Sequence, residues 1–413
     1  MRILLPVLLL LLLSATAQAA DLGGRFKLDA IGYDAGEDTA EAMLGYKTAN
    51  EVAGQLRVSL NQQWREWKAQ VSWQLDARHG SAVKRDQALA EAYPMLVGGS
   101  TDTSFWDLER TITDSDGNDA SQRLDRLNLS YSSNTWVARL GRQALTWGSG
   151  LVFHPMDLVN PFQPVATDTA YKRGTDMAYL QWLLTDGSDI QLVDVPHKAR
   201  DSGDPDGDKA TQAVFANFVG ETFQWNLLLA KDRADRVLGA GASGSWGGAV
   251  WNLEMIPTYL EQHTTRTSGL LNFSYASVLM GRNITAFVEY YRNGFGESDD
   301  EYCLMDLNAD LLLRIQRGQL FVTGRDYLSA GATLEWTPLL QLQPTLILNA
   351  RDHSGLVDLQ LSRSLGNDTN LKAGLRLAIG GRGSEFGGLE VEPGSGRYLA
   401  RSDQVFLRVE TYF

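Results

Sequence analysis

Several stretches of this chain alternate apolar and polar side chains, which is the pattern of a strand with one apolar and one polar face. In the segment 67–76, Trp67, Val71 and Leu75 fall on one face, while Lys68 and Gln74 fall on the other. This period of two predicts β-strands rather than helices.

The C-terminal segment 403–413 alternates in the same way down to a terminal aromatic residue. Leu407, Val409 and Phe413 share one face, while Arg408 and Glu410 lie on the other. An apolar face suits lipid and a polar face suits a water-filled interior, as in the strands of outer-membrane barrels.

Alternation bounded by turn residues gives about eighteen strand candidates, most of them on the order of 9 to 13 residues long, which suits a tilted membrane-crossing strand. They lie at 24–34, 55–61, 67–76, 122–131, 135–143, 175–184, 188–196, 211–218, 222–231, 235–243, 246–256, 267–275, 281–292, 325–336, 339–351, 355–363, 371–379 and 403–413. We therefore predict an all-β fold, a transmembrane antiparallel β-barrel of about 18 strands (16–18) with long extracellular loops.

The lengths of the connections support this architecture, because outer-membrane barrels have short periplasmic turns and long outer loops. Short links fall at 62–65, 132–134, 185–187, 219–221, 243–245, 277–280, 337–338 and 366–368. Long segments lie between them at 77–121, 144–174, 197–210, 293–324 and 380–402. An even strand count then places both termini on the periplasmic side.

The first twenty residues combine Arg2, an apolar run and small residues before Ala20, which is the pattern of a cleaved secretion signal. After residue 20 no apolar run approaches the roughly 20 residues of a membrane-spanning helix. The expected organisation is a signal peptide at 1–20 and one barrel at 21–413, exported to the outer membrane of a Gram-negative bacterium.

Composition changes this picture little. The 44% hydrophobic and 21% charged residues would suit a soluble protein as well. The net charge of −13 and the lack of a basic stripe argue against a nucleic-acid partner. The one cysteine, Cys303, cannot form an intrachain disulfide, so stability must come from the strand network.

The most distinctive stretch is 140–162, where a strand runs into a long outer loop. Three of its elements resemble a loop of proteobacterial outer-membrane porin-like proteins, an uncharacterised family near the alginate-export porins. These elements are Gly141-Arg142-Gln143, Trp147-Gly148 and the run from Asp157 to Phe162. The resemblance is sharp over about 25 residues. The C-terminal strand supports it, and it is looser elsewhere.

This resemblance implies that the 144–174 loop folds into the barrel and that Arg142, Trp147, Asp157 and Asn160 line or narrow the passage. The alternative is that glycine, proline and tryptophan only shape a tight loop. The same resemblance implies that Phe413 is read by the barrel-assembly machinery during insertion, and that outer-membrane lipid and lipopolysaccharide surround the barrel.

The polar faces of the clearer strands carry charges of both signs in nearly equal number. Charges that face a water-filled lumen can steer a solute, or they can pair across the barrel and brace it. Together with the loop residues, the lumen and constriction candidates on the strands are Arg57, Lys68, Arg126, Arg139, Glu289, Glu335, Arg376, Arg408 and Glu410.

Two weaker signals concern other chemistry. Asp204, Asp206 and Asp208 cluster carboxylates around a glycine and could wrap Ca²⁺, but they lack the full calcium-loop pattern, and a solvated acidic loop is the competing interpretation. Ser149 could serve a barrel lipase, but it lacks the nucleophile-elbow spacing and a partnering histidine. We expect no enzyme activity, no bound metal and no cofactor.

Within 293–324, Leu304, Leu307, Leu311 and Ile315 recur at helical spacing and predict a short amphipathic helix that plugs the mouth or caps the loop. The function expected from the whole pattern is a porin-like channel for passive passage of a small polar or oligomeric solute. The alternative is a plugged envelope scaffold or export accessory that binds polysaccharide or a periplasmic partner. The sequence does not identify the solute.

Overall fold

Eighteen antiparallel strands form a closed barrel in the computed structural model, which describes residues 20–93, 104–198 and 205–413. Each strand of the barrel pairs with the next one along the chain, and the first strand also pairs with the last. The predicted signal peptide lies almost wholly outside the described residues. The all-β barrel and its strand number are confirmed.

The barrel strands are β1 (Asp21–Asp34), β2 (Thr48–Trp64), β3 (Trp67–His79), β5 (Asn118–Ser132), β6 (Trp136–Gln143), β7 (Thr175–Leu183), β8 (Asp189–Lys198), β9 (Pro205–Val219), β10 (Phe223–Asp232), β11 (Asp235–Trp246), β12 (Ala249–Tyr259), β13 (Thr265–Leu279), β14 (Arg282–Arg292), β15 (Asp326–Thr337), β16 (Leu340–Asn349), β17 (Gly355–Ser364), β18 (Thr369–Ile379) and β21 (Asp403–Tyr412). The loops carry the short strands β4 (Glu109–Ser115), β19 (Leu389–Glu390) and β20 (Tyr398–Leu399), and the helices α2 (Ala40–Met43), α3 (Ser81–Ala92), η1 (Leu304–Asp306) and α4 (Ala309–Gln316).

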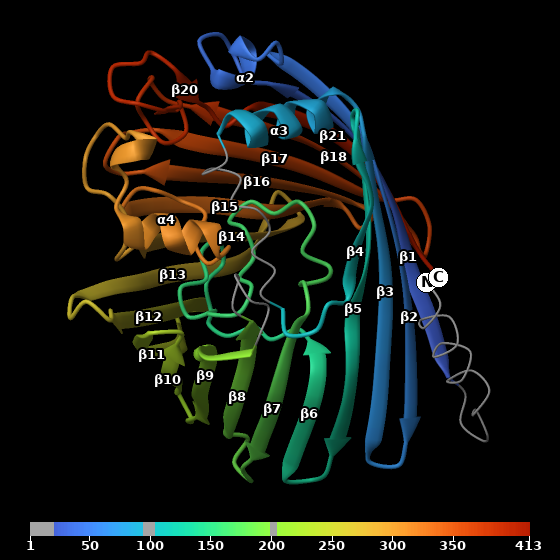
Figure 1. The fold of residues 1–413 in the computed structure, drawn as a ribbon. Coiled ribbons are helices and arrows are strands. Elements are labelled where there is room, and N and C mark those ends of the chain that lie inside the picture. Colours follow the sequence, from blue (N-terminus) through green and yellow to red (C-terminus); the bar gives the residue numbers. More distant parts are fainter. Residues whose placement is uncertain (1–19, 94–103, 199–204) are drawn as a thin grey trace.

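Both ends of the barrel chain lie at the rim that carries the short turns. Arg25 near the start of β1 pairs in register with Tyr412 near the end of β21. The long loops with their helices gather at the opposite rim (Figure 1). This confirms the expected alternation of short turns and long loops.

Some of the short turns follow directly from their residues. Gly247 and Gly248 have φ angles of 57° and 85° and join the register partners Trp246 and Ala249. Two consecutive residues with positive φ make the type I′ turn, whose twist matches that of the flanking strands. Glycine adopts this conformation without steric cost, so the Gly-Gly pair fixes the hairpin at this point.

The two faces of the wall have the polarity that the alternation predicts. Along β21, Val405, Leu407 and Val409 are exposed on the outside, whereas Arg408 and Glu410 are buried on the inside. The ladder of register pairs carries this division around the barrel. The outer wall therefore presents a largely apolar band, and the inner wall presents the polar and charged residues.

The 293–324 segment contains the predicted helix. Asn308 caps α4 by accepting a hydrogen bond from the backbone of Leu311 at 2.8 Å. The apolar side of the segment, with Leu304, Leu307 and Leu311, packs into a buried cluster with Leu260 of the β12–β13 loop. The helix is thus docked at the mouth of the barrel. No helix among the described residues is long and apolar enough to span a membrane.

One predicted loop is wrong. The segment 197–210 is mostly strand, because β8 continues to Lys198 and β9 begins at Pro205. Strands that rise above the membrane can pair while their side chains stay in water, so a polar sequence does not end them. The two-stranded β19–β20 ribbon and β4, which extends the β5 edge, were also not predicted.

Candidate constriction of the barrel lumen

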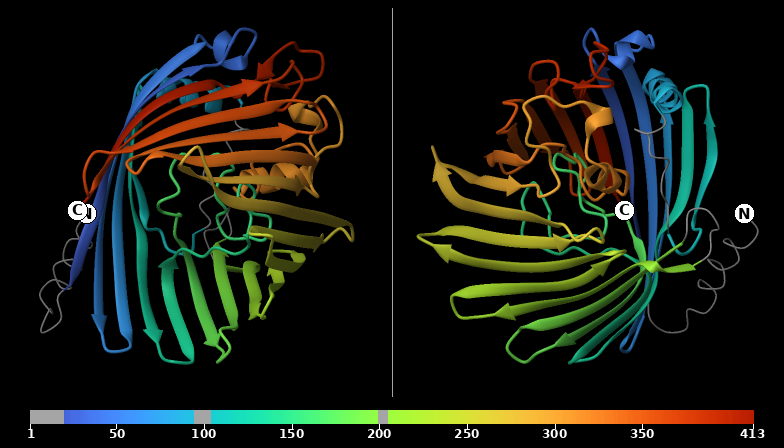
Figure 2. Two further views of the ribbon diagram at one scale, coloured as in Figure 1. Left: turned by 180° about the vertical axis from the view of Figure 1, so that it is seen from behind. Right: turned by 60° about the vertical axis from the view of Figure 1, so that its left-hand side comes forward.

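The loop 144–174 crosses the inside of the barrel. It leaves β6 at Gln143 and returns to β7 at Thr175, and these two residues are register partners. Between them the loop contacts inward-facing side chains of β1, β8, β12, β14, β18 and β21, and it lies inside the ring of strands in Figures 1 and 2. We call it the constriction loop.

A carboxylate on the wall holds the first turn of the constriction loop. Glu289 of β14 accepts hydrogen bonds from the backbone N–H groups of Leu151, Val152 and Phe153 at 2.6, 3.1 and 2.9 Å. Glu289 is only 1% exposed. Three converging donors offset the cost of burying this charge, because charge-assisted hydrogen bonds are the strong ones.

A second anchor lies on the neighbouring strands. Glu254 of β12 accepts hydrogen bonds from the backbone N–H of Ser149 and, at 2.8 Å, from its hydroxyl. Asn272 of β13 donates to the carbonyl of Ser149 at 3.0 Å and to Glu289 at 3.2 Å. The hydroxyl that a lipase would need as a nucleophile is therefore bonded to a carboxylate that anchors the loop.

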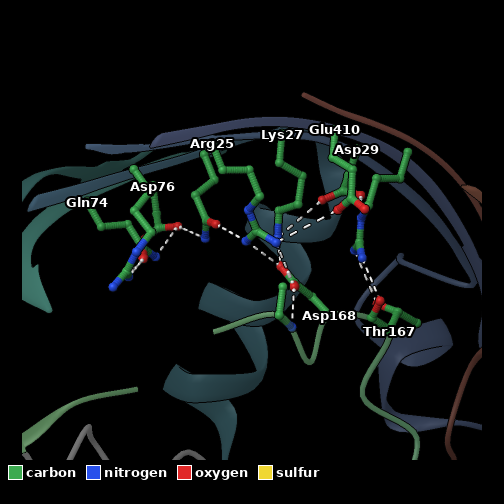
Figure 3. Close-up of polar contacts among 12 residues, drawn as sticks. Arg25, Lys27, Asp29, Gln74, Asp76, Thr167, Asp168 and Glu410 are labelled. Atoms are coloured by element: carbon green, nitrogen blue, oxygen red, sulfur yellow. Dashed lines mark hydrogen bonds and ion pairs between the residues drawn. The ribbon is translucent and has the colours of Figure 1, made fainter. Parts of the chain in front are cut away.

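The far end of the loop is held on the opposite side of the lumen (Figure 3). Asp168 accepts hydrogen bonds from Arg25 at 2.7 and 2.8 Å and from Lys27 at 2.7 Å, both on β1. Next to it, Arg408 of β21 donates to the carbonyl of Thr167 at 2.7 Å. The loop is thus attached to strands β1 and β21 as well as to β12, β13 and β14.

The charge of Asp168 is stabilised where it lies. Burial alone would raise its pKa, but the hydrogen bonds and positive charges of Arg25 and Lys27 outweigh burial and hold the pKa of Asp168 well below its usual value. The attachment to β1 is therefore an ion pair over the whole neutral and mildly acidic range.

Apolar side chains fill the space between the loop and the remaining wall. Trp147 stacks on Phe215 of β9 with ring centroids 5.3 Å apart, and its indole N–H donates to Gln191 at 2.8 Å. Phe153 stacks on Tyr291 of β14 with ring centroids 4.4 Å apart. These contacts belong to two buried clusters, one against β7–β12 and one against β13–β17.

An ion pair closes the base of the loop. Lys172 binds both the carboxylate of Asp157 and the carbonyl of Leu145. Burial raises the pKa of Asp157 to about 6, although Lys172 opposes this shift. Burial also lowers the pKa of Lys172 and lowers that of the nearby His154 to about 4.

The four loop candidates occupy different places. Trp147 and Asp157 are buried and brace the loop, as described above. Asn160 is exposed, adopts a φ of 52° and donates to the hydroxyl of Thr175 at 2.5 Å. All three lie within the loop that crosses the lumen.

Arg142 lies on the other face of the wall. Its register partners are Leu127 and Asp176, so it shares the outward face with Leu140. Its guanidinium binds Asp176 at 2.7 Å and donates to the carbonyl of Trp106 at 2.7 Å. Arg142 thus braces the outer end of β6 and does not join the lumen candidates.

The wall candidates on β2, β5, β18 and β21 form a paired network. Arg57 and Arg126 share Asp125, at 2.5 and 2.6 Å. Arg376 binds Asp358 at 3.0 Å, and Arg408 binds Asp29 at 2.5 Å. Glu410 binds Lys372 at 2.9 Å. Most of these groups are deeply buried, so the bracing interpretation of the wall charges fits their geometry.

The remaining wall candidates are more accessible. Lys68 and Arg139 are register neighbours of Ser130 on β5, on the inner face below the constriction loop. Lys68 is exposed, and Arg139 donates to Gln143 at 3.2 Å. Glu335 near the short-turn rim accepts a hydrogen bond from Asn283 at 2.7 Å. These side chains remain the candidates that face water in the lumen.

The inner wall separates charge around its circumference. We call the inner face of β18, β21, β1, β2, β3, β5 and β6 the basic arc, because its cations outnumber the carboxylates Asp29, Asp125 and Glu410 that pair with them. The cations are Arg25, Lys27, Arg57, Lys68, Arg123, Arg126, Arg139, Lys372, Arg376 and Arg408. Carboxylates of the strands on the rest of the wall include Asp189, Glu254, Glu289 and Glu335. Asp358 instead pairs with Arg376 on the adjacent strand β18.

Sequence reasoning missed several of the attachment residues. Arg25 and Lys27 lie on the polar face of β1, which looked like a weak strand, and Asp168 and Tyr171 lie in a loop without a pattern. Tyr171 lies under the guanidinium of Arg57, 4.3 Å from its ring centroid. Alternation along β1 could have pointed to the two cations, whereas nothing local points to their loop partners.

The terminal and metal candidates can also be placed. Phe413 exchanges backbone hydrogen bonds with Gly24, and a side chain at Gly24 would collide with its ring. Asp204 lies outside the described residues, and Asp206 and Asp208 lie in β9. In the part of the chain that the structure describes, no cluster of histidine, cysteine and acidic residues suited to a metal occurs.

No protein-family model and no curated protein sequence matches this chain. Solved structures do resemble it. OpdQ of Pseudomonas aeruginosa superposes with a TM-score of 0.54 at 9% identity, over 96% of this chain and 99% of that one. OccK9 (OpdG) of the same organism superposes with a TM-score of 0.56 at 12% identity, over 95% of this chain and 98% of that one. OccAB2 of Acinetobacter baumannii superposes with a TM-score of 0.55 at 9% identity, over 95% of this chain and 98% of that one.

These neighbours are outer-membrane porins, and at such low identity the likeness concerns the fold. It covers nearly the whole length of each chain, so no large part of the barrel is left unmatched. The chain thus has the fold of an outer-membrane porin.

Proposed function

We propose that this protein is an outer-membrane channel through which small polar solutes diffuse, and that the constriction loop sets the width of the passage. The observation that carries the proposal is the attachment of this loop to both sides of the lumen, at Glu289 and at Asp168. A barrel of about this strand number encloses an aqueous lumen unless loops fill it. The porin fold of the neighbours supports the proposal.

Charge on the inner wall supports a polar solute. The inner wall carries charged side chains of both signs, with cations in excess on the basic arc, and a low-dielectric wall focuses their field into the lumen. Such a field orients a solute that carries a dipole or a charge. No energy source is needed, because diffusion down a gradient suffices.

The sharper resemblance, to porin-like proteins near the alginate-export porins, rests on the 140–162 motif. It supports passage of an oligomeric solute. The outer-membrane location, the surrounding lipid and lipopolysaccharide, and recognition of Phe413 by the assembly machinery belong to the same proposal.

A second candidate is a plugged barrel that serves as an envelope scaffold or export accessory. The observation in its favour is the density of contacts that the constriction loop and α4 make across the mouth. Such a protein would bind polysaccharide or a periplasmic partner without passing a solute.

Osmotic swelling of proteoliposomes tests the two candidates. Liposomes that contain the refolded protein are diluted into isotonic sugars and sugar acids of increasing size. A channel gives swelling rates that fall steeply with solute size. Rates equal to those of protein-free liposomes for every solute, with folding checked by heat-modifiable gel mobility, would establish a closed barrel instead.

A further inference from the structure

A pocket of about 280 Å³ opens at the outer mouth, above the constriction loop. It lies between that loop, the β10–β11 turn at Arg233 and the C-terminal end of α4 at Arg317. Its charged and polar lining includes Asn160, Arg173, Asp176, His197, Asp232, Arg233, Arg317 and Gln319. A solute that enters the barrel from outside meets this pocket before the constriction.

Two arginines of the pocket are close enough to repel each other. Burial and the positive charge of Arg233 together lower the pKa of Arg317 to about 10, although Asp232 opposes the shift. Burial also lowers the pKa of Arg233. Among the described residues, the guanidinium of Arg317 has no hydrogen-bond or ion-pair partner. An anion bound between the two groups would relieve their repulsion.

The carboxylates of the pocket are engaged elsewhere. Asp232 accepts hydrogen bonds from the hydroxyl of Thr211 at 2.6 Å and from Gln319 at 2.9 Å. Asp176 is held by Arg142 at 2.7 Å. Their oxygens are therefore committed to neighbours, and Arg317 is left to present its donors to the pocket.

Contacts on the other side of α4 fix its position. Arg314 binds Asp235 at 2.5 Å and lies over the ring of Phe295, 3.8 Å from its centroid. Gln319 reaches back to Asp232 on the wall. These contacts fix the backbone that carries Arg317 before any ligand arrives, so only its side chain has to be ordered on binding.

We propose that this pocket binds an oxyanion group, a phosphate or a carboxylate, of a solute that enters the barrel. The planar guanidinium groups of Arg233 and Arg317 suit the two oxygens of either group. The proposal names the solute class of the channel and so rests on the proposed function. The pocket is large enough for one such group and not for a long chain, so it selects an end group.

Isothermal calorimetry on the refolded full chain in detergent tests the site directly, without a measurement of channel current. Sodium phosphate and sodium acetate are titrated separately at pH 7.5 and constant ionic strength. The wild type is expected to bind one anion per barrel. Arg317→Gln should weaken binding roughly tenfold or more, and Arg317→Lys should weaken it less, because charged hydrogen bonds are lost or only rearranged.

The matched control is Arg397→Gln, which changes an exposed arginine of another outer loop and should leave binding unchanged. Tighter binding of phosphate would assign phosphorylated solutes to the pocket, and tighter binding of acetate would assign carboxylates. Equal binding by the wild type and Arg317→Gln, or none by the wild type, overturns the proposal. A barrel that binds the anion but passes no solute would contradict the channel and leave the pocket standing.

Discussion

Asp168 accepts a hydrogen bond from Arg25 at 2.7 Å across 143 residues of sequence. The contact joins the constriction loop to the strand that closes the barrel, where β1 pairs with β21. A loop that starts at β6 and ends at β7 is thereby tied to a strand four places away around the barrel. The width of the passage therefore depends on a few attachments and not on the barrel alone.

Asp168→Asn should loosen this attachment. The variant keeps the shape of the side chain but removes its charge, so Arg25 is left with a weaker partner. The side chain of Arg25 is only 2% exposed. Breaking a buried ion pair by removing one partner costs about 3–5 kcal/mol. We expect larger or more fluctuating single-channel currents in planar bilayers. Glu37→Gln, which removes an exposed pair with Lys47, is the control and should conduct like the wild type.

Glu289→Ala should release the first turn of the loop. The backbone N–H groups of residues 151–153 would lose their acceptor, and each buried donor left without a partner costs about 1–3 kcal/mol. Limited proteolysis of the folded barrel should then cut within 144–174 faster than in the wild type. Glu289→Gln keeps one acceptor oxygen, so its rate of cutting should lie between those of the wild type and Glu289→Ala. Equal cutting of all three would contradict this role of Glu289.

His154 should make loop docking sensitive to acid. Its pKa falls from the ordinary 6.5 to about 4 in the docked loop, through burial and the charge of Lys172, so protonation favours the undocked loop. The contribution of His154 to docking is present above pH 6.5 and is lost as pH falls toward 4, by up to about 3 kcal/mol. Relative to His154→Gln, current fluctuations of the wild type should rise over that interval. His154→Gln should flatten the dependence of the current fluctuations on pH. The raised pKa of Asp157 acts in the opposite direction, but Asp157 is present in both proteins and so does not affect the comparison.

Lys68→Glu should change ion preference with little effect on folding. Lys68 is exposed on the inner face of β3, below the constriction loop. Reversing its charge lowers the local anion concentration, more so at low salt, where screening is weak. The reversal potential in a salt gradient should shift toward cations. The matched control, Arg363→Glu, changes an outward-facing residue at the same rim and should give no shift.

Deletion of Phe413 should reduce the amount of folded barrel in the outer membrane. Phe413 closes the barrel at Gly24 through two backbone hydrogen bonds, and the residue is 62% exposed. Cell fractionation and heat-modifiable gel mobility measure the folded protein. Unchanged levels would refute the proposed assembly signal, whereas Phe413→Tyr should preserve it.

Much of the barrel follows from local sequence, because alternation with period two is a property of each strand alone. The segment 67–76 and the end of the chain were placed correctly for this reason, with Leu407 outside and Arg408 inside. The predicted helix in 293–324 was also found, since α4 is amphipathic. The start of β9 lies above the membrane, where both faces of a strand can be polar. It therefore lacks the alternation that predicts the other strands.

The contacts of the constriction loop are long-range, and local sequence does not contain them. Asp168 is one of many acidic loop residues, and only the closed fold brings it to Arg25. The expectation for Arg142 came from the loop motif, whereas the regular alternation of β6 puts Arg142 on the outward face with Leu140. Glu289, by contrast, lies on the predicted polar face and meets the loop there.

The most direct test of the constriction compares single-channel conductance of the refolded wild type with that of a variant in which a two-residue Asn-Gly turn replaces 144–174. Gln143 and Thr175 are register partners, so such a turn can join them without disturbing β6 or β7. We predict steady openings in the wild type and clearly larger ones in the variant. Equal conductance, or silence from both folded proteins, would contradict a passage narrowed by this loop.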